Sequence, residues 1–247
     1  MNFTILRFDT IESTNTEALN QAERGADEGL CVVAQRQTAG RGRHGRVWVS
    51  PKNAGLYFSL VLRPRFEMRF FPLVTLTAAI AVHDALEALY PIECDIKWVN
   101  DIHVCGKKIC GILAETAETK KGAAIVVGIG VNLKSENFSP EIAEIATSVE
   151  AETGAAPNAE ILLQNLTANL SRYYDLLQGE SGAAKIRAEW TRRSSYADGK
   201  SVKITTENEI IRGTTRGIET DGALRVEIEN GEIRVVRAGD VENLRTV

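Results

Sequence analysis

The sequence predicts an α+β protein in which a larger mixed domain is followed by a small all-β domain. Up to about residue 193, apolar runs of strand length alternate with stretches whose apolar residues recur at helical spacing. After Asp198, short β-prone runs follow one another, separated by EN, DG and NG turns. We therefore expect two domains, residues 1–195 and residues 196–247, the second folded as a small barrel or sandwich.

The expected elements follow from the spacing of apolar residues and from capping signals. Thr14 and Glu17 have capping-box spacing, so a helix begins at Ser13 or Thr14. Asn158 is the expected cap of a later helix, which Gly179 ends. The predicted helices are residues 13–25, 72–90, 158–178 and 183–193, with one more short helix within 134–157. The predicted strands are residues 3–13, 31–37, 55–64, 95–104, 107–116, 123–133, 200–206, 209–219, 223–229 and 232–240.

Composition excludes several classes of protein. The chain has 247 residues, 44% of them hydrophobic and 25% charged, with a formal net charge of -4, so any anion site must be local. The first 30 residues lack a signal-peptide pattern, and we expect no membrane span. Four cysteines without a C-x-x-C pair, and three histidines, make a structural zinc site unexpected. Free thiols in a reducing cytoplasm are the interpretation we favour.

Residues 37–50, QTAGRGRHGRVWVS, contain a literal G-x-G-x-x-G. A dinucleotide-binding turn needs a helix after this motif and an acid about 20 residues later, but a turn and a strand follow, with arginines at the later position. No P-loop motif occurs, and the basic residues are confined to one short loop, which argues against a nucleic-acid patch. The pattern favours a flexible anion-binding loop in which Arg41, Arg43 and Arg46 contact phosphate or carboxylate oxygens.

Other polar residues follow β-prone segments. KWVND either ends a strand as an ordinary Asn-Asp turn, or supplies Lys97 to an anion, Asn100 to a polar ligand and Asp101 to a cation such as Mg²⁺. If this segment is one strand, Lys97, Val99 and Asp101 share a face. GKKICGILAE places two lysines before an apolar strand, where each is either solvated or a charge beside a reacting group. VGIGVNL carries two glycines inside a strand, which indicate close approach either by a ligand or by another backbone.

Taken in order, these segments resemble the biotin protein ligases. The motifs that carry the resemblance are the STN start, Q-x-A-G-R-G-R-x-G-R-x-W, K-W-x-N-D, G-K-K-I-x-G-I-L-x-E, G-I-G-x-N and the small β domain at the end. The resemblance implies a mixed-sheet catalytic domain like those of class II synthetases and an SH3-like β-barrel. It also implies a reaction in which biotin and MgATP give biotinyl-5′-adenylate, whose acyl group then passes to one lysine of a biotin carboxyl carrier protein.

The resemblance assigns roles by position. Arg43 and Lys108 are expected to be catalytic, and Asp101 is a candidate Mg²⁺ ligand. The expected biotin-binding residues are Ser13, Thr14, Asn15, Gln37, Gly40, Arg41, Gly42, Arg43, Lys108, Gly111, Gly128 and Gly130. The expected ATP-binding residues are Arg43, Arg46, Lys97, Asn100 and Asn132.

Three positions depart from the family pattern: Val99 stands for proline, His44 for arginine, and Cys110 for a smaller residue. Catalytic sequence begins within about a dozen residues of Met1, so we expect a ligase without a DNA-binding domain or repressor function. The resemblance also suggests a homodimer, which the sequence by itself does not establish. Two rivals stay open, namely a lipoate-protein ligase or octanoyltransferase of the same fold, and a non-enzymatic biotin sensor or DNA-binding regulator.

Overall fold

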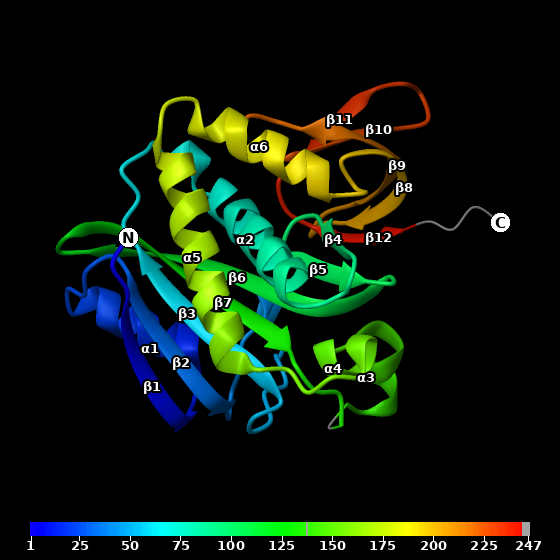
Figure 1. The fold of residues 1–247 in the computed structure, drawn as a ribbon. Coiled ribbons are helices and arrows are strands. Elements are labelled where there is room, and N and C mark those ends of the chain that lie inside the picture. Colours follow the sequence, from blue (N-terminus) through cyan, green and yellow to red (C-terminus); the bar gives the residue numbers. More distant parts are fainter. Residues whose placement is uncertain (137, 244–247) are drawn as a thin grey trace.

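The computed structural model describes residues 1–136 and 138–243. A seven-stranded sheet runs in the order β1-β2-β3-β7-β6-β5-β4 (Figure 1). Only the β1–β2 pair is parallel among its described pairings, so the sheet is mixed, as expected. The strands are β1 (Thr4–Ile11), β2 (Leu30–Gln37), β3 (Gly55–Leu62), β4 (Cys94–Lys97), β5 (Asp101–Val104), β6 (Lys107–Thr119) and β7 (Gly122–Asn132).

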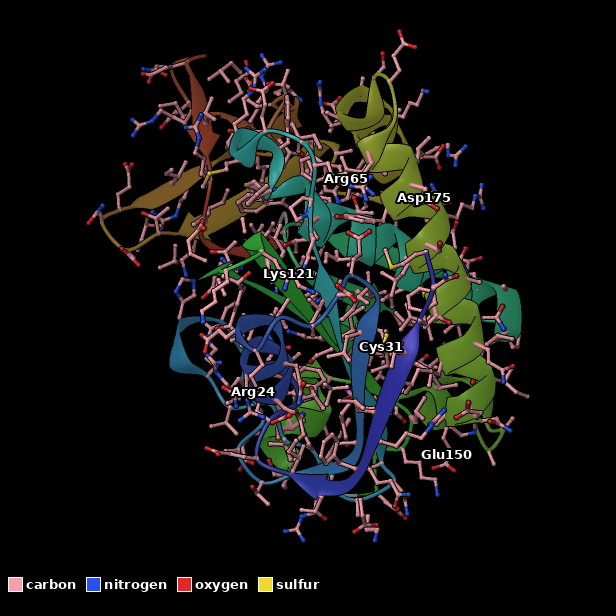
Figure 2. All side chains as sticks on the ribbon, turned by 90° about the vertical axis from the view of Figure 1, so that its left-hand side faces the viewer. Arg24, Cys31, Arg65, Lys121, Glu150 and Asp175 are labelled. Atoms are coloured by element: carbon pink, nitrogen blue, oxygen red, sulfur yellow. The ribbon has the colours of Figure 1, made fainter. Side chains whose placement is uncertain are left out.

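Helices cover both faces of this sheet. Helices α2 (Leu73–Leu89) and α5 (Ala159–Gln178) lie across one face, and α1 (Thr14–Glu23) lies on the other (Figure 1). On β3, Leu60 and Leu62 belong to the core beneath α2 and α5, while Val61 belongs to the core beneath α1. This alternation is the period-two pattern of a strand buried on both sides. Cys31 on β2 also lies in the larger core (Figure 2).

The core beneath α1 is built from small side chains. It consists of Ala18, Ala22, Val32, Val61, Ala124 and Val126. Short side chains on both partners let the helix backbone approach the sheet closely. Ser13 begins the helix as its N-cap, accepting a hydrogen bond from the Thr16 backbone N–H at 3.4 Å. The start of α1 is thereby held close over the middle of the sheet.

Helix α2 is apolar on nearly every side and is buried between the sheet, α5 and α6 (Gly182–Arg193). The stretch Met68–Leu89 is long and apolar enough to cross a bilayer by composition, but 67% of its apolar window is buried inside the structure. This is the pattern of a core helix rather than evidence of a membrane segment.

The C-terminal residues form a separate antiparallel sheet of five strands, ordered β11-β10-β9-β8-β12 (Figure 1). The small all-β unit expected from the sequence is therefore confirmed. No pairing joins β11 to β12, so the sheet formed by the described residues is not closed into a barrel. The division into domains 1–195 and 196–247 stays a prediction. The strands are β8 (Asp198–Thr205), β9 (Ile210–Ile218), β10 (Leu224–Glu227), β11 (Ile233–Val236) and β12 (Asp240–Asn243).

The single strand predicted over residues 95–104 is wrong. The chain instead turns after Lys97, through Trp98–Val99, whose peptide bond is cis, and returns as β5. Lys97 therefore faces Asp101 across a β-hairpin, and Val99 lies in the turn rather than on a shared strand face. The reason is tertiary, because the buried Trp98 donates from Nε1 to the carbonyl of Gly222, in the turn between β9 and β10, at 3.0 Å.

Two further boundaries differ from the prediction. The segment 134–157 holds two short helices, α3 (Pro140–Ile145) and α4 (Val149–Thr153), where one was expected. The predicted strand 232–240 divides into β11 and the start of β12, which pairs with β8. Short elements of this kind are set by long-range pairing more than by local sequence.

An ion pair fixes α6, which leads into the C-terminal sheet, to α2. Arg193 at the end of α6 donates from Nε and Nη2 to the two carboxylate oxygens of Asp84, at 2.6 and 2.9 Å. Tyr173 of α5 donates to the same carboxylate at 2.5 Å. Burial favours the neutral acid, but the hydrogen bonds from His83, Arg193 and Tyr173 outweigh it and hold the pKa of Asp84 well below its ordinary value.

We predict that Asp84→Asn lowers the free energy of unfolding by about 2 to 3 kcal/mol, since the largely buried Arg193 guanidinium loses its two-point contact with a carboxylate and keeps, among the described carboxylates, only the pair with Glu189. Urea unfolding followed by far-UV circular dichroism measures this loss. The matched control is Asp27→Asn, whose side chain is 90% exposed and pairs with Lys121, and it should change stability by less than about 0.5 kcal/mol. Equal losses in the two variants would contradict the prediction.

Candidate active site

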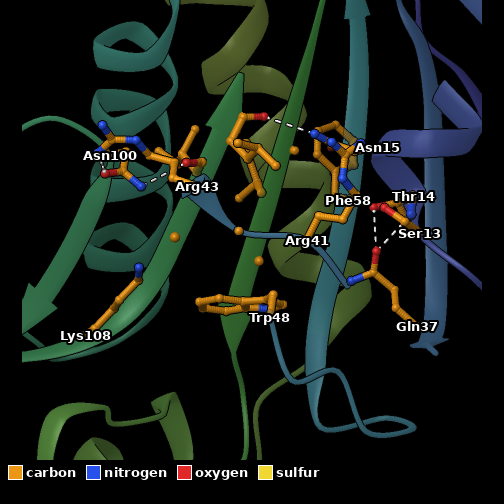
Figure 3. Close-up of a pocket in the computed structure, with 17 residues that line it drawn as sticks. Ser13, Thr14, Asn15, Gln37, Arg41, Arg43, Trp48, Phe58, Asn100 and Lys108 are labelled. Atoms are coloured by element: carbon orange, nitrogen blue, oxygen red, sulfur yellow. Dashed lines mark hydrogen bonds between the residues drawn. The ribbon is translucent and has the colours of Figure 1, made fainter. Parts of the chain in front are cut away.

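A narrow cavity lies on the α1 face of the large sheet, over β3, β6 and β7, beneath the loop of residues 38–50 (Figure 3). Its volume is about 60 Å³, which is room for only a few water molecules. It is lined by Ser13, Thr14, Asn15, Gln37, Arg41, Gly42, Arg43, Trp48, Phe58, Asn100, Lys108, Gly111, Ile112, Leu113, Gly128, Ile129 and Gly130. Strand register brings these residues together, because Ser59, Gly128 and Leu113 lie in one row across the sheet.

Two glycines on β7 leave space that side chains from other elements fill. A Cβ on Gly128 would lie 2.0 Å from Oδ1 of Asn15, and one on Gly130 would lie 2.4 Å from Nε1 of Trp48. Neither contact is compatible with a side chain. Trp48 therefore lies against the sheet inside the cavity, and among the described residues its buried Nε1 has no hydrogen-bond partner. An occupant larger than a few waters requires this ring and its loop to shift.

The end of the cavity beside α1 is polar. Oε1 of Gln37 accepts from the Thr14 backbone N–H at 2.8 Å and from its hydroxyl at 3.1 Å (Figure 3). Nε2 of Gln37 donates to Ser50 at 2.8 Å. Ser59, which is fully buried, lies 2.6 Å from Oδ1 of Asn15. Most of these side chains keep one hydrogen-bond donor or one lone pair that no protein group uses, and that a ligand can use.

The loop above the cavity carries three arginines, and each is held by a different element. Arg41 contacts Glu115 of β6 at 2.7 Å. Arg43 donates to Oδ1 of Asn100 at 2.9 Å and to the Gly239 carbonyl at 3.5 Å. Arg46 pairs with Asp240 at the start of β12. The loop therefore bridges the large sheet and the C-terminal sheet.

Burial and neighbouring charges shift the pKa values of Arg43 and Asp240. Burial lowers the pKa of Arg43, which the charges of Asp240 and Asp101 partly offset. Burial favours neutral Asp240, but its hydrogen bond to Arg46 and the charges of Arg46 and Arg43 keep its pKa below the ordinary value. The pair between loop and C-terminal sheet is therefore charged at neutral pH.

The other end of the cavity is cationic. Nζ of Lys108 lies 2.7 Å from Oδ1 of Asp101 and 5.4 Å from the centre of the Trp48 ring. Lys97 lies across the β4–β5 hairpin from Asp101, and burial lowers its pKa. In residues 1–136 and 138–243, no group of three or more His, Cys, Asp or Glu side chains could hold a metal ion. Asp101, already paired with Lys108, does not by itself form a metal site.

His103 lies beside this cationic end, two residues after Asp101. Its Nδ1 is 3.1 Å from the Gly106 carbonyl. Burial, and next the charge of Lys97, lower the pKa of His103 to about 4. The ring is therefore neutral at physiological pH, with its proton on Nδ1, where it can donate to that carbonyl.

The structure brings most of the predicted residues together. Every predicted biotin-binding residue except Gly40 lines the cavity, and so do Arg43 and Asn100 of the predicted ATP set. Arg46, Lys97 and Asp101 lie outside its lining. Asn132 is 9% exposed and donates to the Thr147 carbonyl at 3.0 Å. The sequence analysis missed the apolar lining, Trp48, Phe58, Ile112, Leu113 and Ile129, although these residues lie within or beside the motifs that it used.

Comparison with known proteins identifies the family. Residues 7–132 match the Biotin/lipoate A/B protein ligase family, and residues 199–242 match the Biotin protein ligase C terminal domain. The chain belongs to the biotin protein ligase family. The enzyme class expected from the sequence, a biotin–protein ligase, is therefore confirmed. The family and its named relatives also support ligation of biotin to a carboxylase.

Individual relatives are similar to this chain in sequence or structure along most of its length. A biotin--[acetyl-CoA-carboxylase] ligase of Paracoccus denitrificans is 38% identical, over 86% of this chain and 90% of its own length. The bifunctional ligase/repressor BirA of Bacillus spizizenii is also 38% identical, over 95% of this chain and 72% of its own length. The solved biotin protein ligase of Aquifex aeolicus in complex with biotin and ATP superposes with a TM-score of 0.84 at 29% identity, covering 98% of this chain and 99% of that one.

We predict that Gly128→Ala weakens biotin binding by the ligase at least tenfold, because the methyl group displaces the Asn15 amide. Isothermal titration calorimetry with biotin measures the loss. Gly179→Ala is the matched control, since its Cβ would have no neighbour nearer than 3.5 Å and its φ of -79° suits alanine. Unchanged biotin affinity in Gly128→Ala would show that Asn15 is not part of the binding surface.

We also predict that acid destabilises the ligase partly through His103. The unfolded chain takes up a proton on this residue below pH 6.5, whereas the folded protein resists it until about pH 4. Stability is therefore lost as the pH falls through this window. His103→Gln should lose less stability than the wild type between pH 7.5 and pH 5, as measured by urea midpoints at both values. The same loss in both proteins would contradict this assignment.

Proposed function

We propose that this chain is an ATP-dependent ligase that forms biotinyl-5′-adenylate from biotin and MgATP. It then transfers the biotinyl group to one lysine of a biotin carboxyl carrier protein. The observation that carries the proposal is one narrow cavity with a polar, amide-rich end and a cationic end, separated by apolar surface. Biotin has the same order of groups, namely a cyclic urea, an apolar ring and chain, and a carboxylate.

The polar end matches a cyclic urea, which has one carbonyl acceptor and two N–H donors. The Ser13 hydroxyl accepts from the Thr16 N–H and can still donate. Nε2 of Gln37 has a second N–H besides the one given to Ser50. Oδ1 of Asn15 has a lone pair besides the one facing Ser59. Two donors for the carbonyl and an acceptor for an N–H are therefore available.

The apolar part of the lining suits the fused ring and alkyl chain. Trp48 and Leu113 line the cavity between its two ends. Ile112 and Ile129 alternate with the cavity-facing residues of their strands, and their side chains belong to the core on the opposite face of the sheet. Removing such surface from water favours binding by about 25 cal/mol per Å². The ring of Trp48 is the largest movable part of this wall.

The cationic end suits the first reaction. A biotin carboxylate oxygen attacks the α-phosphorus of ATP, the bond to the bridging oxygen breaks, and pyrophosphate leaves with that electron pair. Two anions must meet, so Lys108 and Arg43 are placed to offset their repulsion. The predicted ATP contacts Arg46, Lys97 and Asn132 would act beyond the cavity lining.

In the second reaction the carrier lysine, as the free amine, attacks the carbonyl carbon of the mixed anhydride. The bond between that carbon and the phosphate oxygen breaks, AMP leaves, and the amine loses a proton. The chemistry requires no enzyme nucleophile. The loop of residues 38–50 covers the cavity, which supports a role in excluding water from the hydrolysable adenylate.

Mg²⁺ enters the proposal with ATP rather than through a site made by the protein. The described residues form no group of three or more potential metal ligands, and Asp101, the candidate expected from the sequence, is paired with Lys108. Mg²⁺ commonly keeps several waters and binds chiefly through substrate phosphates. The assignment of Asp101 as a ligand stays a prediction, and no step is derived through the metal.

The remaining parts of the proposal concern partners and location. We place the ligase in the cytoplasm, with a carboxylase carrier subunit as its partner. No DNA binding or repressor function is included in the proposal. The expected homodimer stays a prediction.

The activity is tested by incubating the purified protein with ATP, Mg²⁺, a biotin carboxyl carrier domain and either labelled biotin or labelled lipoate. We expect biotin on the carrier, dependent on ATP, and biotin-dependent exchange of pyrophosphate into ATP. Labelling by lipoate but not biotin would replace the proposal with a lipoate-protein ligase. Biotin binding without pyrophosphate exchange would favour a non-enzymatic sensor.

We predict that Lys108→Ala lowers the rate of adenylate formation by about 10²- to 10³-fold, because it removes a positive charge from the reacting carboxylate and phosphate. Pyrophosphate exchange measures this rate. Lys107→Ala is the matched control, since this neighbour is exposed and, among the described residues, its side chain donates only to the Ala143 carbonyl, at 2.7 Å. Its activity should stay within about twofold of the wild type. Equal activity in the two variants would remove Lys108 from the mechanism.

A further inference from the structure

Glu115 ends the G-I-L-A-E run on β6, and its carboxylate joins two parts of the site. Oε1 accepts from Nη2 of Arg41 at 2.7 Å, and Oε2 accepts from Nδ2 of Asn15 at 2.9 Å. The Glu115 side chain is 23% exposed. It points to the α1 face because Gly111, Leu113 and Glu115 alternate along one side of the strand. One side chain therefore contacts both the start of α1 and the loop over the cavity.

The contact with Glu115 determines which way the Asn15 amide points. Nδ2 has two N–H groups, and these go to Glu115 and to the Leu113 carbonyl, the latter at 3.2 Å. A carboxylate paired with arginine only accepts hydrogen bonds, so the amide oxygen cannot face it. Oδ1 consequently points toward Ser59 and the bare backbone at Gly128. Asn15 presents an acceptor, not a donor, to the cavity.

The same polar path continues to the other end of the loop. Beyond Asn15 it passes through Ser59 to Thr14, with 2.8 Å between the hydroxyl oxygens. Thr14 contacts Gln37, and Gln37 contacts Ser50. The Ser50 hydroxyl then donates to the Trp48 carbonyl at 3.0 Å. The path begins at Arg41 and ends at Trp48, so both ends of the covering loop are tied to the polar end of the cavity.

In the part of the chain that the structure describes, Arg41 and Arg46 each depend on one carboxylate, Glu115 and Asp240 respectively. Among the described residues, Glu115 is the only group that accepts a hydrogen bond from the Arg41 side chain. Arg43 has two acceptors, Asn100 and Gly239. Loss of the Glu115 charge would therefore free the Arg41 end of the loop while the remainder stays held.

We propose that Glu115 is a positioning residue of the biotin site, with two separable effects. It fixes the Asn15 amide so that an acceptor faces the N–H of a cyclic urea, and it anchors the Arg41 end of the loop over the adenylate. Binding of the cyclic urea and closure of the loop of residues 38–50 are thereby coupled through the Glu115 carboxylate. The inference rests on the proposed function.

The test compares Glu115→Gln with the wild type, and with Glu118→Gln as a matched control on the exposed part of the same strand. We expect Glu115→Gln to raise the KM for biotin in pyrophosphate exchange about tenfold, the size of one lost hydrogen bond to a charged group. Direct titration with biotin should show the same weakening. Release of biotinyl-adenylate should become several-fold faster. The Glu118→Gln control should match the wild type in its KM for biotin, its affinity for biotin and its rate of adenylate release.

The two effects are separated by Arg41→Gln and by the double variant. Arg41→Gln should speed adenylate release while changing the KM for biotin less than Glu115→Gln does. If Glu115 holds the loop through Arg41, the double variant should release adenylate no faster than Arg41→Gln alone. A release rate equal to the product of the two single effects would overturn the coupling.

Thermal unfolding of each variant distinguishes positioning from general support of the fold. A lower Tm for Glu115→Gln with an unchanged KM for biotin and unchanged adenylate release would overturn the proposal. So would wild-type behaviour in every assay. Wild-type protein without pyrophosphate exchange would instead refute the proposed function, and the biotin titration would still decide whether Glu115 orients Asn15.

Discussion

On the α1 face of β7, two glycines leave the sheet backbone bare, and side chains from distant segments lie there instead. Asn15 comes from the start of α1 and Trp48 from the loop after β2, and each occupies space that a Cβ on Gly128 or Gly130 would need. These contacts bring the helix and the loop onto the same patch of sheet. The hydrogen-bonded path from Arg41 to Trp48 exists only because both are seated there.

The charges of the site follow a second constraint. The proposed site for a carboxylate and a triphosphate needs several cations, which repel one another when no substrate is bound. Three of them are offset by an acid from another element: Lys108 by Asp101, Arg41 by Glu115 and Arg46 by Asp240. Arg43 donates instead to the neutral oxygens of Asn100 and Gly239. Because Asp240 belongs to β12, the C-terminal sheet takes part in holding the loop. The Asp84–Arg193 pair, which fixes α6 to α2, supports the position of that sheet.

Local sequence predicted most elements because their signals are local. The caps at Ser13 and Asn158 accept hydrogen bonds from the first turns of their helices, as their residue types indicate. The alternation of residues 95–104 predicted one strand wrongly, because the chain turns at Trp98, which is buried and donates to the carbonyl of Gly222, a residue 124 positions away. Lys97 and Asp101 consequently face each other across a hairpin. No window of local sequence contains that information.

The sequence alone determined the fold class, the family and the residue types of the site, since motif order, glycine positions and capping residues are written in the chain. It also placed Ser13, Gln37, Arg43 and Lys108 at one site, and the cavity contains them all. Only the tertiary structure decided which cation pairs with which acid, that Trp48 fills the cavity, and that Glu115 orients Asn15. Those outcomes depend on strand register and on side-chain packing between segments up to about two hundred residues apart, such as Arg46 and Asp240, which no local pattern specifies.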